Sequence, residues 1–187
     1  MSDFEFIFAL FGLLLGLSIA EVLGGLARSI EARLRPDATV KIGWLTPLLG
    51  AFVMLDLLSF WQAAWTTREI VTVSGHTLLA IMAFASAYYL SARLVFPRDI
   101  ELQPDFDAHF FQVRRVVIGA MLALLLCQVA WYASQPALAV YLFRPLALAL
   151  TAVLAALMIA ALAVRSAAGC RWIMAALVLR YVVVYLL

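Results

Sequence analysis

Six long runs of apolar residues constrain this chain more than any other feature of its sequence. An α-helix of about 20 apolar residues crosses the roughly 30 Å of hydrocarbon in a bilayer. Hydrophobic residues make up 67% of the chain and charged residues 13%, whereas soluble domains carry about 25% charged residues. The sequence therefore predicts an all-α membrane protein, a six-transmembrane-helix bundle in a single domain over residues 1–187. The predicted spans are 4–27, 42–65, 77–96, 114–133, 145–164 and 170–187.

The polar segments between these runs carry most of the positive charge, and they carry it unevenly. The first, third and fifth segments, together with the ends of the runs that flank them, hold Arg28, Arg33, Arg35, Lys41, Arg93, Arg98, Arg114, Arg115, Arg165 and Arg171, whereas the second and fourth hold only Arg68 and Arg144. Lysine and arginine accumulate on the cytoplasmic side of membrane proteins. We therefore expect these three segments in the cytoplasm and both termini on the outer side, periplasmic or extracellular. The expected location is the inner (plasma) membrane of a bacterium.

The third polar segment is the longest, and it predicts an amphipathic cytoplasmic connector over residues 98–113. An aspartate such as Asp105 is typical of a helix start. Phe106 and Phe110 would let such a helix lie on the inner membrane surface. Asp105 and His109 would share a helix face, but two candidate ligands do not make a metal site. The sequence favours a solvated connector over a metal centre.

Four charged residues lie deeper in the apolar runs than the first two or last two positions, and their depths predict two ion pairs. Counting along the helices places Asp56 about 21 Å and Arg180 about 15 Å from the inner surface, a difference that a guanidinium side chain spans. Glu21 and Arg93 both fall within about 10 Å of that surface. An isolated charge at such depths costs about 2.5 kcal/mol or more, so pairing is the expected remedy. We expect Asp56 to pair with Arg180 and Glu21 with Arg93; the alternative is that each faces a water-filled cavity.

Two further polar side chains extend these pairs into an interior polar line. Tyr89 shares a helix face with Arg93, and Gln128 falls at about the depth of Asp56. Helix bundles turn such groups inward, away from lipid. The predicted line consists of Glu21, Asp56, Tyr89, Arg93, Gln128 and Arg180. The structural alternative is that these residues fix the register of the helices without moving a solute.

Small residues recur at every fourth position of the first run, at Gly12, Gly16, Ala20 and Gly24. They form a groove into which the backbone of another helix fits closely. The pattern predicts helix packing. It leaves open whether the partner helix belongs to the same chain, to a second copy in a homo-oligomer or to another membrane protein.

Motifs that bind cofactors or carry catalysis are missing from the sequence. Its two histidines, His76 and His109, lie between the spans, which removes support for axial haem ligation by paired histidines. Its two cysteines, Cys127 and Cys170, are expected to be small packing residues rather than a disulfide. The sequence has no G-x-S-x-G elbow, P-loop, C-x-x-C pair or basic amphipathic helix. We expect no catalytic residue, metal, cofactor or nucleic-acid partner, and the lipid bilayer as the surroundings.

The polar line lies in a chain with almost no mass outside the membrane, which favours a transporter or channel for ions or a small polar solute. Asp56 and Arg180 would form the gating or coupling pair, because protonation releases a carboxylate from its arginine. Glu21 and Arg93 would form the inner vestibule. The alternative is a non-catalytic subunit of a membrane complex that assembles through the groove of the first run.

Overall fold

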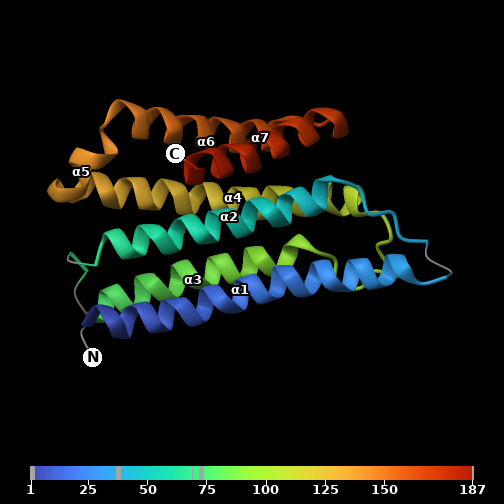
Figure 1. Ribbon diagram of the computed structural model, residues 1–187, viewed down its shortest axis with the longest axis horizontal. Helices are drawn as coiled ribbons and strands as arrows, with labels where there is room; N and C mark the ends of the chain where they lie inside the picture. The colour runs from blue at the N-terminus through green and yellow to red at the C-terminus, as the bar shows by residue number, and fades with distance from the viewer. Residues whose placement is uncertain (1–2, 37–38, 69, 72–73, 187) are drawn as a thin grey trace.

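The structure is a computed structural model that describes residues 3–36, 39–68, 70–71 and 74–186. Within these residues the chain forms seven helices and no β-strand (Figure 1). They are α1 (Asp3–Leu34), α2 (Leu45–Thr66), α3 (Gly75–Val95), α4 (Phe106–Ser134), α5 (Pro136–Leu142), α6 (Pro145–Ala163) and α7 (Ala167–Leu186). All except the short α5 are long and apolar enough to cross a membrane. The prediction of an all-α protein with six such helices is confirmed.

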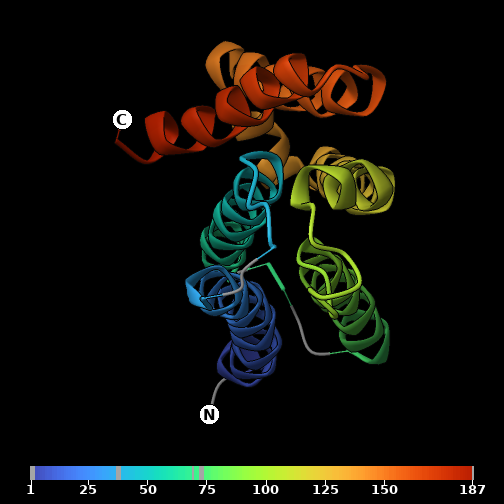
Figure 2. The ribbon, with the colours of Figure 1, turned by 90° about the vertical axis from the view of Figure 1, so that its right-hand side faces the viewer.

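The long helices run side by side in three pairs, with α2 and α4 between the α1–α3 pair and the α6–α7 pair (Figures 1 and 2). Helix α1 packs most extensively against α3, and α7 packs against both α2 and α6. The C-terminal ends of α1, α3 and α6 lie at one end of the bundle, on the right of Figure 1, and we call it the arginine-rich end. The C-terminal end of α2, the start of α3 and the short helix α5 lie at the other end, which we call the α5 end.

The connector expected over residues 98–113 does not form a separate surface helix. Helix α4 begins at Phe106 and continues without a break to Ser134. Asp105 is its N-cap, with a side-chain oxygen that accepts a hydrogen bond from the Ala108 amide at 3.1 Å, as expected for a helix start. Phe106 and Phe110 are fully buried instead of lying on a membrane surface. Burial in the core between the helices removes these rings from water more completely than an interfacial position does.

Hydrogen bonds between the first and third polar segments close the arginine-rich end. The Lys41 amide donates to the Pro104 carbonyl at 2.7 Å, and the Phe106 amide donates to the Lys41 carbonyl at 3.2 Å. Asp107 Oδ1 accepts a hydrogen bond from the Leu45 amide at 3.0 Å. The first amides of a helix have no partner inside the helix, so Asp107 satisfies one of those at the start of α2. These bonds fix α2 against α4.

Large apolar side chains fill the half of the bundle nearer the arginine-rich end. They come from the corresponding halves of α2, α4 and α7 and are at most 1% exposed: Leu45, Leu49, Phe52, Phe106, Phe110, Ile118, Met121, Met174 and Leu177. Close-packed interiors of this kind contain few voids as large as a water molecule. The two cavities described below lie toward the other end.

The outer surface of the bundle is apolar as well. Leu13, Leu79 and Leu146 expose 62%, 72% and 68% of their surface. A soluble monomer rarely exposes large continuous apolar patches, whereas lipid accommodates them. The surface and the six long apolar helices together support an integral membrane protein.

Candidate polar site between the helices

The carboxylate of Asp56 lies inside the bundle, held by two tyrosine hydroxyls. Asp56 is only 9% exposed. Tyr88 on α3 donates a hydrogen bond to Oδ2 at 2.7 Å, and Tyr181 on α7 donates one to Oδ1. A buried carboxylate without donors is strongly destabilising. The two tyrosines therefore make the position of Asp56 tolerable and tie α3 and α7 to α2.

Arg180 lies close to Asp56 but does not bond to it. Its Nη2 donates to the Leu150 carbonyl of α6 at 3.2 Å, and its guanidinium carbon lies 4.8 Å from the centre of the Tyr181 ring. The buried Nε of Arg180 has no hydrogen-bond partner among the described residues. No side-chain nitrogen of Arg180 lies within 4.0 Å of a carboxylate oxygen of Asp56, so the predicted ion pair between them does not form. The hydroxyl of Tyr181 meets the carboxylate while its ring faces the guanidinium, so the tyrosine bridges the two charges.

A cavity of about 290 Å³ contains both charges. Its lining comes from α2 to α7, with apolar residues such as Leu125 and Leu154 beside the polar ones. The polar lining residues are Asp56, Ser59, Tyr88, Gln128, Tyr132, Tyr141, Thr151, Arg180 and Tyr181. A polar cavity of this size has room for several water molecules or one small solute. We call this cavity and its lining the Asp56 site.

Tyr88 takes the place that the sequence analysis gave to Tyr89. Tyr88 is 3% exposed, whereas Tyr89 is 36% exposed and bonds to no carboxylate in the described structure. Successive residues of a helix point about 100° apart, so only one of the two faces the interior. Tyr88 shares its face with Ala85, Ala92 and Val95, which are all buried. This stripe at helical spacing is the sequence signal that identifies Tyr88.

The Glu21–Arg93 pair forms as predicted. Arg93 Nη1 donates to Glu21 Oε1, and Arg28 Nη2 lies 3.6 Å from the same oxygen. The side chains of Glu21 and Arg93 remain 20% and 35% exposed. Neither residue lines the Asp56 site. The predicted polar line therefore forms two separate clusters. Asp56, Gln128 and Arg180 line the Asp56 site, whereas Glu21 and Arg93 form the other cluster.

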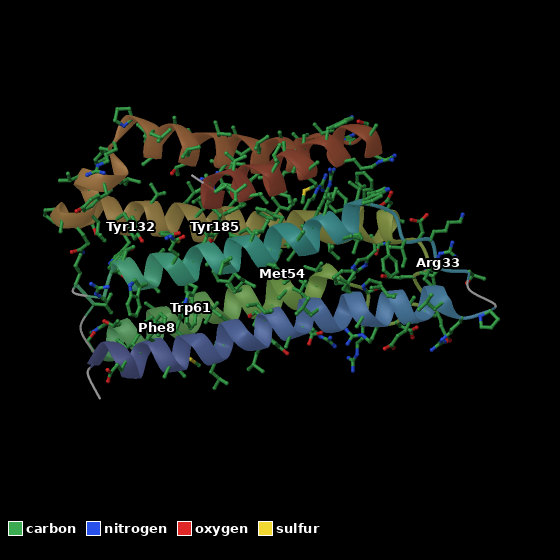
Figure 3. All side chains as sticks on the ribbon, in the orientation of Figure 1. Phe8, Arg33, Met54, Trp61, Tyr132 and Tyr185 are labelled. Carbon is green, nitrogen blue, oxygen red and sulfur yellow. The ribbon has the colours of Figure 1, made fainter. Side chains whose placement is uncertain are left out.

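A second, larger cavity lies beside the Asp56 site. It has a volume of about 560 Å³ and lies between α1, α2, α3 and α4 toward the α5 end. Phe8 and Tyr132 both line this cavity, and Figure 3 shows them near the α5 end, whereas Arg33 lies at the arginine-rich end. Its walls are mostly aromatic and aliphatic, and we call it the aromatic chamber. Phe60, Gln128 and Tyr132 line both cavities.

Arg114 is a buried cation that the sequence analysis assigned to a polar segment. It is 4% exposed, and its Nη1 donates to the carbonyls of Ala161, at 3.0 Å, and Val164. Nη1 also lies 3.3 Å from Cys170 Sγ, and the guanidinium carbon lies 4.8 Å from the Phe111 ring centre. The last carbonyls of a helix lack partners within it, so Arg114 satisfies the end of α6. Only the packing of α4 against α6 reveals this role.

Asp105 and His109 do not converge on a metal site. The His109 ring nitrogens lie 2.8 Å from Gln103 Oε1 and 3.2 Å from the Leu94 carbonyl. The Asp105 side chain caps α4. Among the described residues, no group of three or more histidine, cysteine, aspartate or glutamate side chains is placed to hold a metal ion.

The small-residue stripe of α1 faces the rest of the chain only at its first member. A Cβ added to Gly12 would lie 2.8 Å from the Trp61 ring, so these helices are in close contact there. A Cβ added to Gly16 would meet nothing within 4 Å, and Ala20 is exposed. A Cβ added to Gly24 would meet only the Arg28 side chain, at 3.5 Å. Most of the groove predicted for helix packing is therefore open.

The close approach within the chain occurs instead at two glycines outside the stripe. A Cβ added to Gly25 would lie 2.7 Å from Phe96, and one added to Gly50 would lie 3.2 Å from the same ring. Phe96, which follows α3, thus fills the space between α1 and α2 that the missing side chains leave. The sequence analysis missed this contact because its partner comes from outside both helices.

Comparison with known proteins adds no family to these observations. No protein-family model, curated protein or solved structure matches this chain. The chemistry of the Asp56 site therefore carries the functional inference.

Proposed function

We propose that this protein is a small membrane transporter or channel that moves an ion or a small polar solute through the Asp56 site. The observation that carries the proposal is a cavity holding an acid and a base that are not bonded to each other. Charged groups are expensive within a membrane, and those that face a polar cavity mark solute or ion pathways. A purely structural role would be served by a direct ion pair in a closed interior.

The arrangement also supplies a way to couple ion binding to helix movement. Protonation of Asp56 would remove the negative charge that attracts the hydroxyls of Tyr88 and Tyr181. The links from α2 to α3 and α7 would weaken together, and the helices would be free to shift. The cavities lie toward the α5 end while apolar side chains close the arginine-rich end, an asymmetry that fits one state of an alternating-access cycle.

The distribution of basic residues supports an orientation for this pathway. The positive-inside rule places the arginine-rich end in the cytoplasm and both termini outside. The cavities then face outward, and the Glu21–Arg93 cluster lies near the cytoplasmic side as an inner vestibule. We place the protein in the inner membrane of a bacterium and assign it no enzymatic activity.

Flux through reconstituted liposomes tests the proposal. Wild-type protein is expected to carry a flux of protons, simple ions or small organic ions that protein-free liposomes lack. Asp56→Asn keeps the shape of the side chain but removes its charge and is expected to reduce the flux at least about tenfold, the scale of a charged hydrogen bond. A pH-sensitive dye inside the liposomes and radiolabelled solutes outside provide the readout.

The matched control is Asp99→Asn, which makes the same change in an exposed loop. It is expected to leave the flux unchanged. Equal flux in wild-type and Asp56→Asn liposomes, or no flux of any tested solute through folded protein, would contradict a pathway through Asp56.

A second candidate function rests on the open part of the α1 groove. Gly16 and Ala20 are accessible on the outer side of α1, where a helix of another subunit has room to approach. We propose a non-catalytic subunit, in a homo-oligomer or a complex with another membrane protein, as the alternative. Folded protein that is silent in liposomes but co-purifies with a defined membrane partner would favour it.

A further inference from the structure

The Asp56 site and the aromatic chamber are neighbours with a shared wall. Phe60 of α2 and Gln128 and Tyr132 of α4 line both cavities. Aromatic side chains can change rotamer without a change in the backbone, so a rotamer change of Phe60 or Tyr132 would join the two spaces. The combined space is polar and charged at one end and apolar at the other.

The unused hydrogen-bond donors at the polar end belong chiefly to a cation, Arg180. Asp56 already accepts hydrogen bonds from two tyrosines, one on each carboxylate oxygen. The guanidinium of Arg180 has five N–H donors but makes one hydrogen bond among the described residues, to the Leu150 carbonyl. Its Nε is buried without a partner. An anionic group at Arg180 would satisfy donors that the folded chain leaves unused, and Gln128 and Thr151 line the same space with further polar groups.

The apolar end is suited to a hydrophobic body. Phe8, Phe11, Phe84 and Trp131 line the aromatic chamber together with aliphatic side chains. Its volume of about 560 Å³ is within the range of cavities that hold small organic ligands, about 300–1,000 Å³. A simple inorganic ion gains nothing from such walls, whereas an aromatic or aliphatic group is stabilised by leaving water.

We infer that the ligand of these joined cavities is an organic monoanion, with its acidic group at Arg180 and its apolar body in the aromatic chamber. A single negative charge follows from the lining, because Arg180 is the only arginine or lysine among the described residues that line either cavity. The Asp56 carboxylate in the same cavity offsets the charge of Arg180, so no excess positive charge is left for a second negative group. The inference rests on the proposed function, for which it names the class of solute.

Ligand binding to the full chain in lipid nanodiscs tests this inference without a transport assay. The probe is 4-fluorobenzoate, whose fluorine NMR line broadens on binding, with empty nanodiscs as the blank. We expect saturable binding that is at least about tenfold tighter than that of 4-fluorobenzylamine, which has the opposite charge, and of acetate, which lacks the apolar body. Acetate and chloride are measured by competition. The inference would be overturned if chloride displaced 4-fluorobenzoate as effectively as unlabelled benzoate does, or if 4-fluorobenzylamine bound as tightly as 4-fluorobenzoate.

Two variants separate the two ends of the site. Arg180→Gln is expected to weaken 4-fluorobenzoate binding at least about tenfold, whereas Arg171→Gln, the same change at an exposed position of α7, leaves it unchanged. Ala80→Phe adds a ring to the wall of the aromatic chamber and leaves Arg180 in place. It is expected to weaken 4-fluorobenzoate binding at least about tenfold through lost volume. Unchanged binding in folded Arg180→Gln would overturn the inference. If Arg180→Gln does not fold, unchanged binding in Ala80→Phe would overturn it.

Binding and flux fail independently. If 4-fluorobenzoate binds as expected and no solute crosses liposomes, the ligand class stands and the transport proposal fails. If another solute crosses in an Asp56-dependent manner and 4-fluorobenzoate does not bind, the ligand class fails and the transport proposal stands.

Discussion

Replacing both tyrosines that hold Asp56, in Tyr88→Phe/Tyr181→Phe, is expected to lower the free energy of unfolding by about 3–5 kcal/mol. The rings remain in place, but the carboxylate loses a donor from each oxygen while it stays buried. Each hydrogen bond to a charged group contributes about 1.5–3 kcal/mol, so either single variant should lose about half as much. Reversible unfolding in mixed detergent micelles, followed by circular dichroism, measures the difference.

Tyr89→Phe is the matched control for this variant. It removes the same hydroxyl one position along α3, from a side chain that is 36% exposed. The expected change is within about 0.5 kcal/mol. A double variant no less stable than Tyr89→Phe would mean that the tyrosines do not hold the carboxylate.

Arg114→Leu is expected to lower the free energy of unfolding by about 3–5 kcal/mol. Leucine cannot donate to the carbonyls of Ala161 and Val164 at the end of α6, which would be left without this donor in the interior. It also removes the contact with Cys170. The same unfolding experiment measures the loss.

Arg115→Leu provides the comparison. Arg115 is the exposed neighbour of Arg114, so this substitution removes the same charge without removing a buried donor. We expect it to alter the free energy of unfolding by less than about 0.5 kcal/mol. If the two leucine variants lost equal stability, the hydrogen bonds at the end of α6 would not be the cause.

Hydropathy and depth along the chain predicted the coarse structure. A run of about 20 apolar residues has few stable alternatives to a helix in a membrane, so the six long helices were predictable. The Glu21–Arg93 pair was also predictable, because two opposite charges at matched depth lower each other's cost wherever their helices meet. Both predictions depend only on distance along the helix axes.

The details of the Asp56 site depend on how each helix is rotated about its own axis, which depth does not specify. That rotation selects Tyr88 over Tyr89 and places the hydroxyl of Tyr181, rather than Arg180, against the carboxylate. It also turns Gly16 outward. Rotations follow from side-chain packing between helices distant in sequence, so the residues of one helix cannot reveal them alone.

Cysteine accessibility tests the central claim, a polar cavity around Asp56 and Arg180 that water enters from the α5 end. Thr151→Cys lines this cavity on α6, whereas Met158→Cys lies on the same helix at a fully buried position. Both are introduced after Cys127 and Cys170 are replaced by serine, and a membrane-impermeant methanethiosulfonate is added to either side of the liposomes. The account predicts that Thr151→Cys reacts in the folded protein with reagent at the α5 end only, and that Met158→Cys reacts from neither side. Thr151→Cys that stays unreactive until the protein is denatured would contradict it.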